Sequence, residues 1–122
     1  MLENIKKDVS YNLDQSLRLE IISVKELIIS NLQDIDIYLF GSIAKGCYSS
    51  HSDIDILILI HDNKSVRELR KLRHFFEDEI EKLLIDREVD LKVYYNCRFK
   101  ELAKVPSFEN IILNDLIDIR RW

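Results

Sequence analysis

Hydrophobic residues recur at three- and four-residue intervals in two long stretches of the chain, which is the spacing of an amphipathic helix. The first stretch covers residues 13–32, and the second covers 65–84 with Ser65 as its N-cap. The exposed side of the second stretch is basic in its first half and acidic in its second half. Such a charge run is typical of a solvated helix face. A last helix is predicted over 107–119, directly after Pro106.

Three shorter stretches predict β-strands, because they are rich in β-branched and aromatic residues and lie between turn-forming residues. They cover residues 35–40, 53–60 and 89–95. Residues 41–52 are turn-rich around one possible helical turn, so the first two strands are expected to be antiparallel neighbours. The second and third strands are joined through a helix and should be parallel. This order, α-β-turn-β-α-β-α, predicts an α+β fold with a three- to four-stranded mixed sheet flanked by helices.

Composition and charge restrict the class of protein. The 122 residues are 47% hydrophobic and 33% charged, as expected for one globular domain spanning residues 1–122. The net charge of −4 argues against a dedicated nucleic-acid surface. The longest apolar run, residues 56–60, is too short to cross a membrane, and the N-terminus lacks the apolar segment of a secretory signal. Cys47 and Cys97 form no disulfide framework, so a cytoplasmic protein is expected.

The candidate chemistry gathers around the turn between the first two strands. The chain has only two glycines, Gly41 and Gly46, and both lie in this turn, where a tight bend or a close approach to a ligand would require them. Asp53 and Asp55 open the second strand and share one face of it. Two carboxylates held in this way repel each other, and Mg²⁺ is a natural ion to bind between them.

The predicted topology adds a third carboxylate to this pair. Asp90 opens the third strand, and parallel strands begin at the same end of a sheet. Three carboxylates can organise two metal ions about 3.5–4 Å apart, an arrangement that stabilises the attacking and leaving oxygens of a displacement at phosphorus. Each signal is weak when taken alone, since Asp-x-Asp and Gly-Ser are also common in ordinary turns. The three signals together predict a catalytic site.

These residues resemble the signature of a known enzyme superfamily. Gly41-Ser42, a spacer of ten residues, Asp53-Ile54-Asp55 and a further acidic strand residue resemble the nucleotidyltransferases that include the DNA polymerase beta type enzymes. The stretch GSIAKGCYSSHSDIDILILI is most similar to the minimal nucleotidyltransferases, which are often antitoxins encoded beside HEPN-domain toxins. The resemblance extends over residues 35–95 and implies ATP as the substrate with two Mg²⁺ ions.

The resemblance also implies roles for individual residues. Gly41 and Ser42 would bind the triphosphate, and Asp53 and Asp55 would hold Mg²⁺ against it. Asp90 would bind the second ion or accept the proton of the acceptor hydroxyl, which attacks the α-phosphorus and releases pyrophosphate.

Four other residues also lie near this site in the sequence. Lys45 stands where arginine is commoner in the family, and it either contacts phosphate or is a plain surface lysine. Lys92 follows Asp90 by two residues, and a salt bridge with the carboxylates is favoured over a phosphate contact. His51 and Cys47 lie in the spacer without a second zinc ligand or a base partner, so neither a zinc site nor a cysteine nucleophile is expected.

The acceptor is expected to be another protein. The catalytic core uses residues 13–95 and leaves one helix, with no room for an acceptor domain. Apolar residues cover about two-thirds of the circumference of the predicted helix 107–119. Its Leu113 and Ile117 would either dock another chain or be covered by the first helix or the N-terminal segment.

AMP transfer to a HEPN-type toxin is therefore the predicted activity, with a homo- or hetero-oligomer possible. Two alternatives remain open. One is an antitoxin that acts by contact without catalysis. The other is a dimeric nucleotidyltransferase of the antibiotic-modifying type, with its acceptor site built across the interface.

Overall fold

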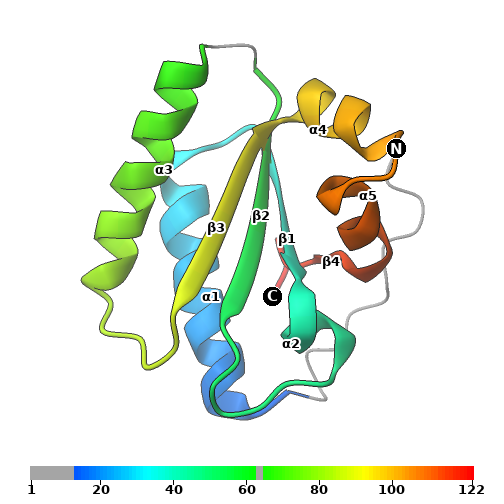
Figure 1. Ribbon diagram of the computed structural model, residues 1–122. Helices are drawn as coiled ribbons and strands as arrows, with labels where there is room; N and C mark the ends of the chain where they lie inside the picture. The colour runs from blue at the N-terminus through cyan, green and yellow to red at the C-terminus, as the bar shows by residue number, and fades with distance from the viewer. Residues whose placement is uncertain (1–12, 63–64) are drawn as a thin grey trace.

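A four-stranded mixed sheet forms the centre of the computed structural model, which describes residues 13–62 and 65–122 (Figure 1). The strands lie in the order β3-β2-β1-β4. Their bounds are Ile35–Phe40 for β1, Ile54–Ile60 for β2, Val89–Tyr95 for β3 and Ile117–Asp118 for β4. β1 is antiparallel to β2 and to β4, whereas β2 and β3 are parallel. The predicted fold class and the pairing of the three long strands are confirmed.

Helices cover both faces of this sheet (Figure 1). On one face lie α1 (Gln15–Asn31) and α3 (Val66–Glu81), and on the other lie α4 (Asn96–Ala103) and α5 (Phe108–Ile112). Successive strand side chains point to opposite faces, so each strand contributes to two hydrophobic cores. In β2, for example, Ile56 and Ile58 join the α1–α3 core, whereas Leu57 and Leu59 join the α4–α5 core.

The two long helices begin where capping residues predict them. The carboxylate of Asp14 accepts a backbone N–H from the first turn of α1, and the Ser65 hydroxyl does the same for α3. These contacts satisfy donors that a helix start leaves unpaired. α3 ends at residue 81, slightly before the predicted end, and Leu84 then adopts a left-handed backbone with φ of 55°. Within residues 13–62 and 65–122, none of the helices is long and apolar enough to cross a membrane.

The predicted helix over 107–119 is wrong, because three short elements replace it. α5 is followed by a 3-10 helix, η2 (Leu113–Asp115), and then by β4. Ile117 is fully buried opposite Leu39 of β1, and Leu113 packs against the α4–α5 core. Of the two alternatives for Leu113 and Ile117, the structure therefore supports packing within the chain, whereas Phe108 and Ile111 of the same segment remain exposed.

The sequence does not predict α4, because half of residues 96–103 are polar. Only Phe99 and Ala103, four positions apart, are buried along this helix. The side chain of its N-cap residue, Tyr95, makes no capping hydrogen bond. Its position therefore depends on packing against β2 and β3, which a local pattern does not reveal.

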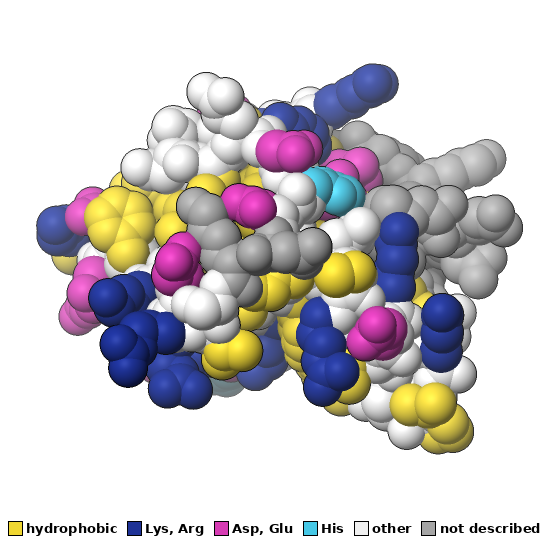
Figure 2. All heavy atoms as spheres, turned by 90° about the horizontal axis from the view of Figure 1, so that it is seen from above, with side chains coloured by type: hydrophobic (Ala, Val, Ile, Leu, Met, Phe, Trp, Pro, Cys, Tyr) yellow, Lys and Arg dark blue, Asp and Glu magenta, His cyan; other side chains and the backbone are white. Residues whose placement is uncertain are grey.

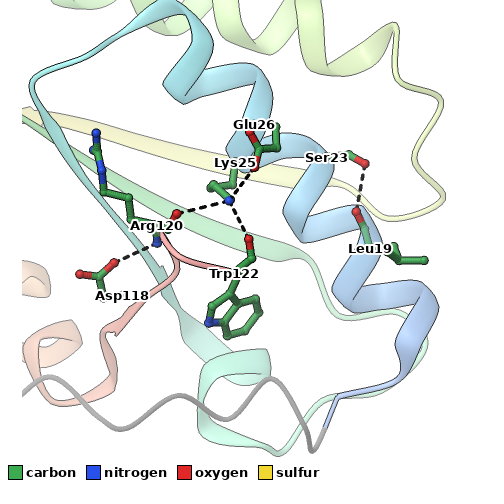
Figure 3. Close-up of polar contacts among 7 residues, drawn as sticks. All are labelled: Leu19, Ser23, Lys25, Glu26, Asp118, Arg120 and Trp122. Atoms are coloured by element: carbon green, nitrogen blue, oxygen red, sulfur yellow. Dashed lines mark hydrogen bonds and ion pairs between the residues drawn. The ribbon is translucent and has the colours of Figure 1, made fainter.

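A buried lysine of α1 forms hydrogen bonds with the segment after β4 (Figure 3). The Lys25 ammonium donates to the backbone carbonyls of Trp122 at 2.8 Å and Arg120 at 3.3 Å, and it pairs with Glu26 at 2.8 Å. Arg120 in turn donates through its guanidinium to the carbonyl of Ile35 at 2.7 Å. Since a buried ammonium is costly unless it is paired and hydrogen-bonded, these contacts hold the segment in one position beside the start of β1.

Candidate active site

The end of β1 and the starts of β2 and β3 meet at one end of the sheet, as predicted. In the register of the strands, Phe40 lies opposite Asp55, and Asp55 lies beside Asp90. Because residues paired across neighbouring strands share a face, the side chains of Asp55 and Asp90 lie on the face that α4 and α5 cover. Asp53 directly precedes β2 and is exposed.

The electrostatic balance of this cluster favours a cation. Burial, followed by the charges of Asp90 and Asp53, raises the pKa of Asp55 to about 6, and Lys92 opposes the shift. Lys92 lies 3.7 Å from the carboxylate of Asp90, which is the predicted pairing. Carboxylate oxygens are the ligands that Mg²⁺ prefers, usually one or two together with phosphate oxygens of a substrate. The donor set therefore fits Mg²⁺.

The three carboxylates do not form a complete metal cage. Within the described residues, no group of three histidine, cysteine, aspartate or glutamate side chains is close enough to hold a metal ion unaided. Such a site needs the oxygens of a bound nucleotide to complete the coordination shell, as Mg²⁺ sites commonly do. His51 and Cys47 are exposed.

Two features require glycine at position 41, directly after β1: its backbone conformation and the nearby Asp55 carboxylate. Its φ is +79°, a conformation that disfavours any side chain, and a Cβ atom there would collide with the carboxylate of Asp55. Gly41 and Ser42 begin the short helix α2 (Gly41–Lys45), which is the predicted helical turn. Gly46 ends it, also with a φ of +79°. The backbone after β1 therefore passes directly against one of the carboxylates.

Lys45 has a partner that sequence reasoning missed. Its ammonium lies 3.5 Å from the carboxylate of Asp115 in η2, which joins α2 to the C-terminal part of the chain. About half of the Lys45 side chain remains exposed (48%). The ion pair therefore holds the ammonium at the site end of the sheet without burying it. No local pattern indicates this contact, because 70 residues separate the two positions.

Arg87 is a second residue that sequence reasoning missed. Its guanidinium donates to the carbonyls of Ser49 at 2.8 Å and Ser52 at 2.7 Å, and it stacks over the ring of Tyr48 at 5.7 Å. These contacts hold the spacer loop that leads into Asp53. The only signal in the sequence is an arginine shortly before the third strand, beside the predicted site.

A cavity lies at the opposite end of the sheet, and none of the three aspartates lines it. It has a volume of about 500 Å³ between α1, α3 and the ends of the strands, and its apolar lining includes Leu32, Leu69, Leu72 and Phe75. Figure 2 looks onto this end, where hydrophobic side chains reach the surface on the α3 side. Asp90 instead lies on the edge strand β3, and Asp55 lies beside it on the neighbouring strand β2.

Removing the charge of Asp55 should stabilise the metal-free protein. A raised folded-state pKa means that the ionised carboxylate disfavours folding above about pH 6, whereas the protonated form carries no penalty below the unfolded value of 3.8. The shift corresponds to about 3 kcal/mol at most, and solvent screening of this half-exposed group reduces it to about 1 kcal/mol. In EDTA at neutral pH, Asp55→Asn should raise Tm by about 3–5 °C.

Thermal unfolding at several pH values checks this expectation. The gain should disappear as the pH falls from 6 to 4, and the exposed Asp34→Asn serves as the control. An equal Tm of Asp55→Asn and wild type at neutral pH would contradict the electrostatic description of the cluster.

Comparison with known proteins agrees with this geometry. Residues 5–119 match the family described as "Nucleotidyltransferase domain". A protein of Methanocaldococcus jannaschii that carries the name "putative protein adenylyltransferase" is 32% identical over 81 residues, which are 66% of this chain and 74% of that protein. The family match over residues 5–119 spans nearly the whole chain and includes every residue of the site. The chain therefore belongs to the nucleotidyltransferase domain family.

Proposed function

We propose that this protein transfers AMP from ATP to a hydroxyl group of a partner protein, which is a HEPN-type toxin. The observation that carries the proposal is the contact between the Gly41 backbone and Asp55, with Asp90 beside it on the next strand. The arrangement puts the backbone at the start of α2 next to carboxylates that favour a cation. The name of the archaeal relative supports a protein as the acceptor.

The residues after β1 would bind the triphosphate. The Ser42 hydroxyl and the backbone amides beside it can donate hydrogen bonds to phosphate oxygens, and Gly41 lets this backbone pass close to Asp55. Lys45 is half exposed and can turn from Asp115 toward the phosphates. Asp53 and Asp55 would hold Mg²⁺, which neutralises phosphate charge and orients the α-phosphate when it is bound.

Asp90 would act on the acceptor. Its carboxylate accepts the proton of the hydroxyl while the hydroxyl oxygen forms a bond to the α-phosphorus. The bond between the α-phosphorus and the oxygen that bridges to the β-phosphate breaks, so pyrophosphate leaves with the electron pair. Lys92, at 3.7 Å from Asp90, would help to orient this carboxylate toward the acceptor.

The position of the site suits a large acceptor. Asp90 is on the edge strand β3, with nearly half of its side chain exposed (46%). A protein hydroxyl can therefore approach from outside the sheet without a channel. AMP adds negative charge to the acceptor, and beside an RNA-binding surface this charge would repel RNA phosphates.

Co-expression with the toxin separates catalysis from simple contact. Wild-type protein should restore growth and add one or more AMP units to the intact mass of the toxin. Asp53→Asn with Asp55→Asn should do neither. If both versions restore growth and the toxin mass does not change, the protein acts by contact, and the proposal is overturned.

Asp90→Ala should separate turnover from nucleotide binding. A group that acts on the proton in the transition state affects the rate far more than the affinity, so we expect kcat to fall about 10²–10⁴-fold. The dissociation constant of ATP, measured by calorimetry, should change less than about threefold. Glu88→Ala, an exposed acidic position just before β3, is the matched control. Equal losses of affinity and rate in folded Asp90→Ala would place Asp90 in substrate binding instead.

A further inference from the structure

The outer face of α3 carries a charge pattern that is complementary to itself. Counted from His74, basic residues stand three, four and seven positions toward the N-terminus, and acidic residues stand three, four and seven positions toward the C-terminus. The basic residues are Lys71, Arg70 and Arg67, and the acidic residues are Glu77, Asp78 and Glu81. These intervals place all six on the same side of a helix as His74. All seven side chains are exposed.

This pattern is unfavourable for α3 on its own. A helix favours acidic residues near its N-terminus and basic residues near its C-terminus, and the face has the reverse order. Arg67 and Lys71 repel each other four positions apart, as do Glu77 and Glu81. Among the described residues, His74 pairs with Glu77 at 3.3 Å, and no ion pair involves Arg67, Arg70 or Lys71. Neighbours within residues 13–62 and 65–122 therefore leave the basic half of the face without an ion pair.

We infer that a second copy of this chain binds this face, with the two α3 helices antiparallel about a two-fold axis at His74. In that arrangement Arg67, Arg70 and Lys71 face Glu81, Asp78 and Glu77 of the second copy, and each contact occurs twice. The dipoles of the two α3 helices are then also antiparallel. A two-fold axis requires a self-complementary surface, and the equal spacing on either side of His74 supplies one.

The location of the face is compatible with two working sites. α3 packs on the α1 side of the sheet, whereas Asp55 and Asp90 lie on the α4–α5 side. Figure 2 shows Lys and Arg side chains gathered on the left, over the beginning of α3. A dimer formed through α3 would leave the carboxylates of both copies open to acceptors.

The expected interface is narrow and mainly electrostatic. The charged positions extend about 21 Å along the helix, and exposed ion pairs contribute little each. Apolar contact is limited to residues beside the charged positions, such as Val66 and Leu84, which are exposed at opposite ends of the face. The dimer should therefore be weak and should dissociate as salt screens the contacts.

Sedimentation of the full chain tests the inference without any substitution. Dimer should be present at about 50 mM NaCl and lost at about 500 mM, because the screening length falls from about 14 Å to about 4 Å. A chain that stays monomeric at low salt and high protein concentration overturns the proposal. A dimer that is insensitive to salt overturns it as well.

Charge reversal gives a sharper test of the antiparallel pairing. One variant carries Arg67→Glu, Arg70→Glu and Lys71→Glu, and the other carries Glu77→Lys, Asp78→Lys and Glu81→Lys. Each alone should associate at least about tenfold more weakly than wild type, whereas an equimolar mixture of the two should form a heterodimer.

The matched control reverses two basic residues of α4 and the basic residue that follows it, with Arg98→Glu, Lys100→Glu and Lys104→Glu, and it should dimerise like wild type. If circular dichroism shows that a triple variant is unfolded, Arg70→Glu and Asp78→Lys replace the two sets. A mixture of folded variants that remains monomeric overturns the proposal.

Discussion

Asp53→Asn together with Asp55→Asn should reduce AMP transfer by about 10³-fold or more while the fold remains intact. The two substitutions remove the negative charges that would hold Mg²⁺ against the nucleotide. Metal-ion catalysis contributes several kcal/mol of charge stabilisation in the transition state, and each 1.36 kcal/mol is tenfold in rate. Initial rates of AMP incorporation at saturating ATP and Mg²⁺ measure the loss.

The chain contains its own matched control for this variant. Asp34-Ile35-Asp36 repeats the same tripeptide as Asp53-Ile54-Asp55, but it lies at the start of β1, at the opposite end of the sheet. Asp34→Asn with Asp36→Asn should keep the rate within about twofold of wild type, because surface substitutions away from a site have small effects. Comparable activity of the two double variants would contradict the assignment of the metal site.

Gly41→Ala should reduce transfer about 10²-fold, although it adds only one methyl group. The methyl group would collide with the Asp55 carboxylate and push it out of position, and a displacement of about 1 Å at a reacting group can cost about 10²-fold. The left-handed backbone at this position adds about 1–2 kcal/mol of strain. Transfer rates and Tm should be measured on the same protein preparations.

Gly46→Ala separates the two causes. Gly46 has the same φ of +79°, and nothing lies within 4 Å of a Cβ atom placed there. The Gly46→Ala variant should therefore lose stability as Gly41→Ala does, and it should keep most of its transfer activity. Equal loss of activity in both variants would show that backbone strain in the turn is responsible, and contact with Asp55 is not.

The central part of the fold follows from local patterns. β2 alternates between two cores, and Ser65 and Asp14 mark helix starts by capping chemistry. The meeting of the site residues follows from the strand topology alone. An antiparallel pair followed by a parallel crossover brings Gly41, Asp55 and Asp90 to one end of the sheet. This part of the site was therefore accessible to reasoning from the sequence.

The C-terminal part was not accessible in this way. The apolar residues of 107–119 satisfy a helical spacing, but Ile117 pairs with Leu39 in β4 because the edge of β1 is free to accept a strand. The partners of Lys45 and Arg87 depend on contacts between residues far apart in the chain. Tertiary contacts of this kind override local propensity, and no residue pattern in the segments involved indicates them.

The position of the transferred label tests the central claim most directly. The purified toxin is incubated with the protein, Mg²⁺ and ATP labelled at either the α- or the γ-phosphate, and the label on the toxin is then measured. AMP transfer predicts incorporation from α-labelled ATP and none from γ-labelled ATP, with both signals absent in Asp53→Asn/Asp55→Asn. Label from γ-labelled ATP, or no label from either with wild-type protein, would contradict AMP transfer.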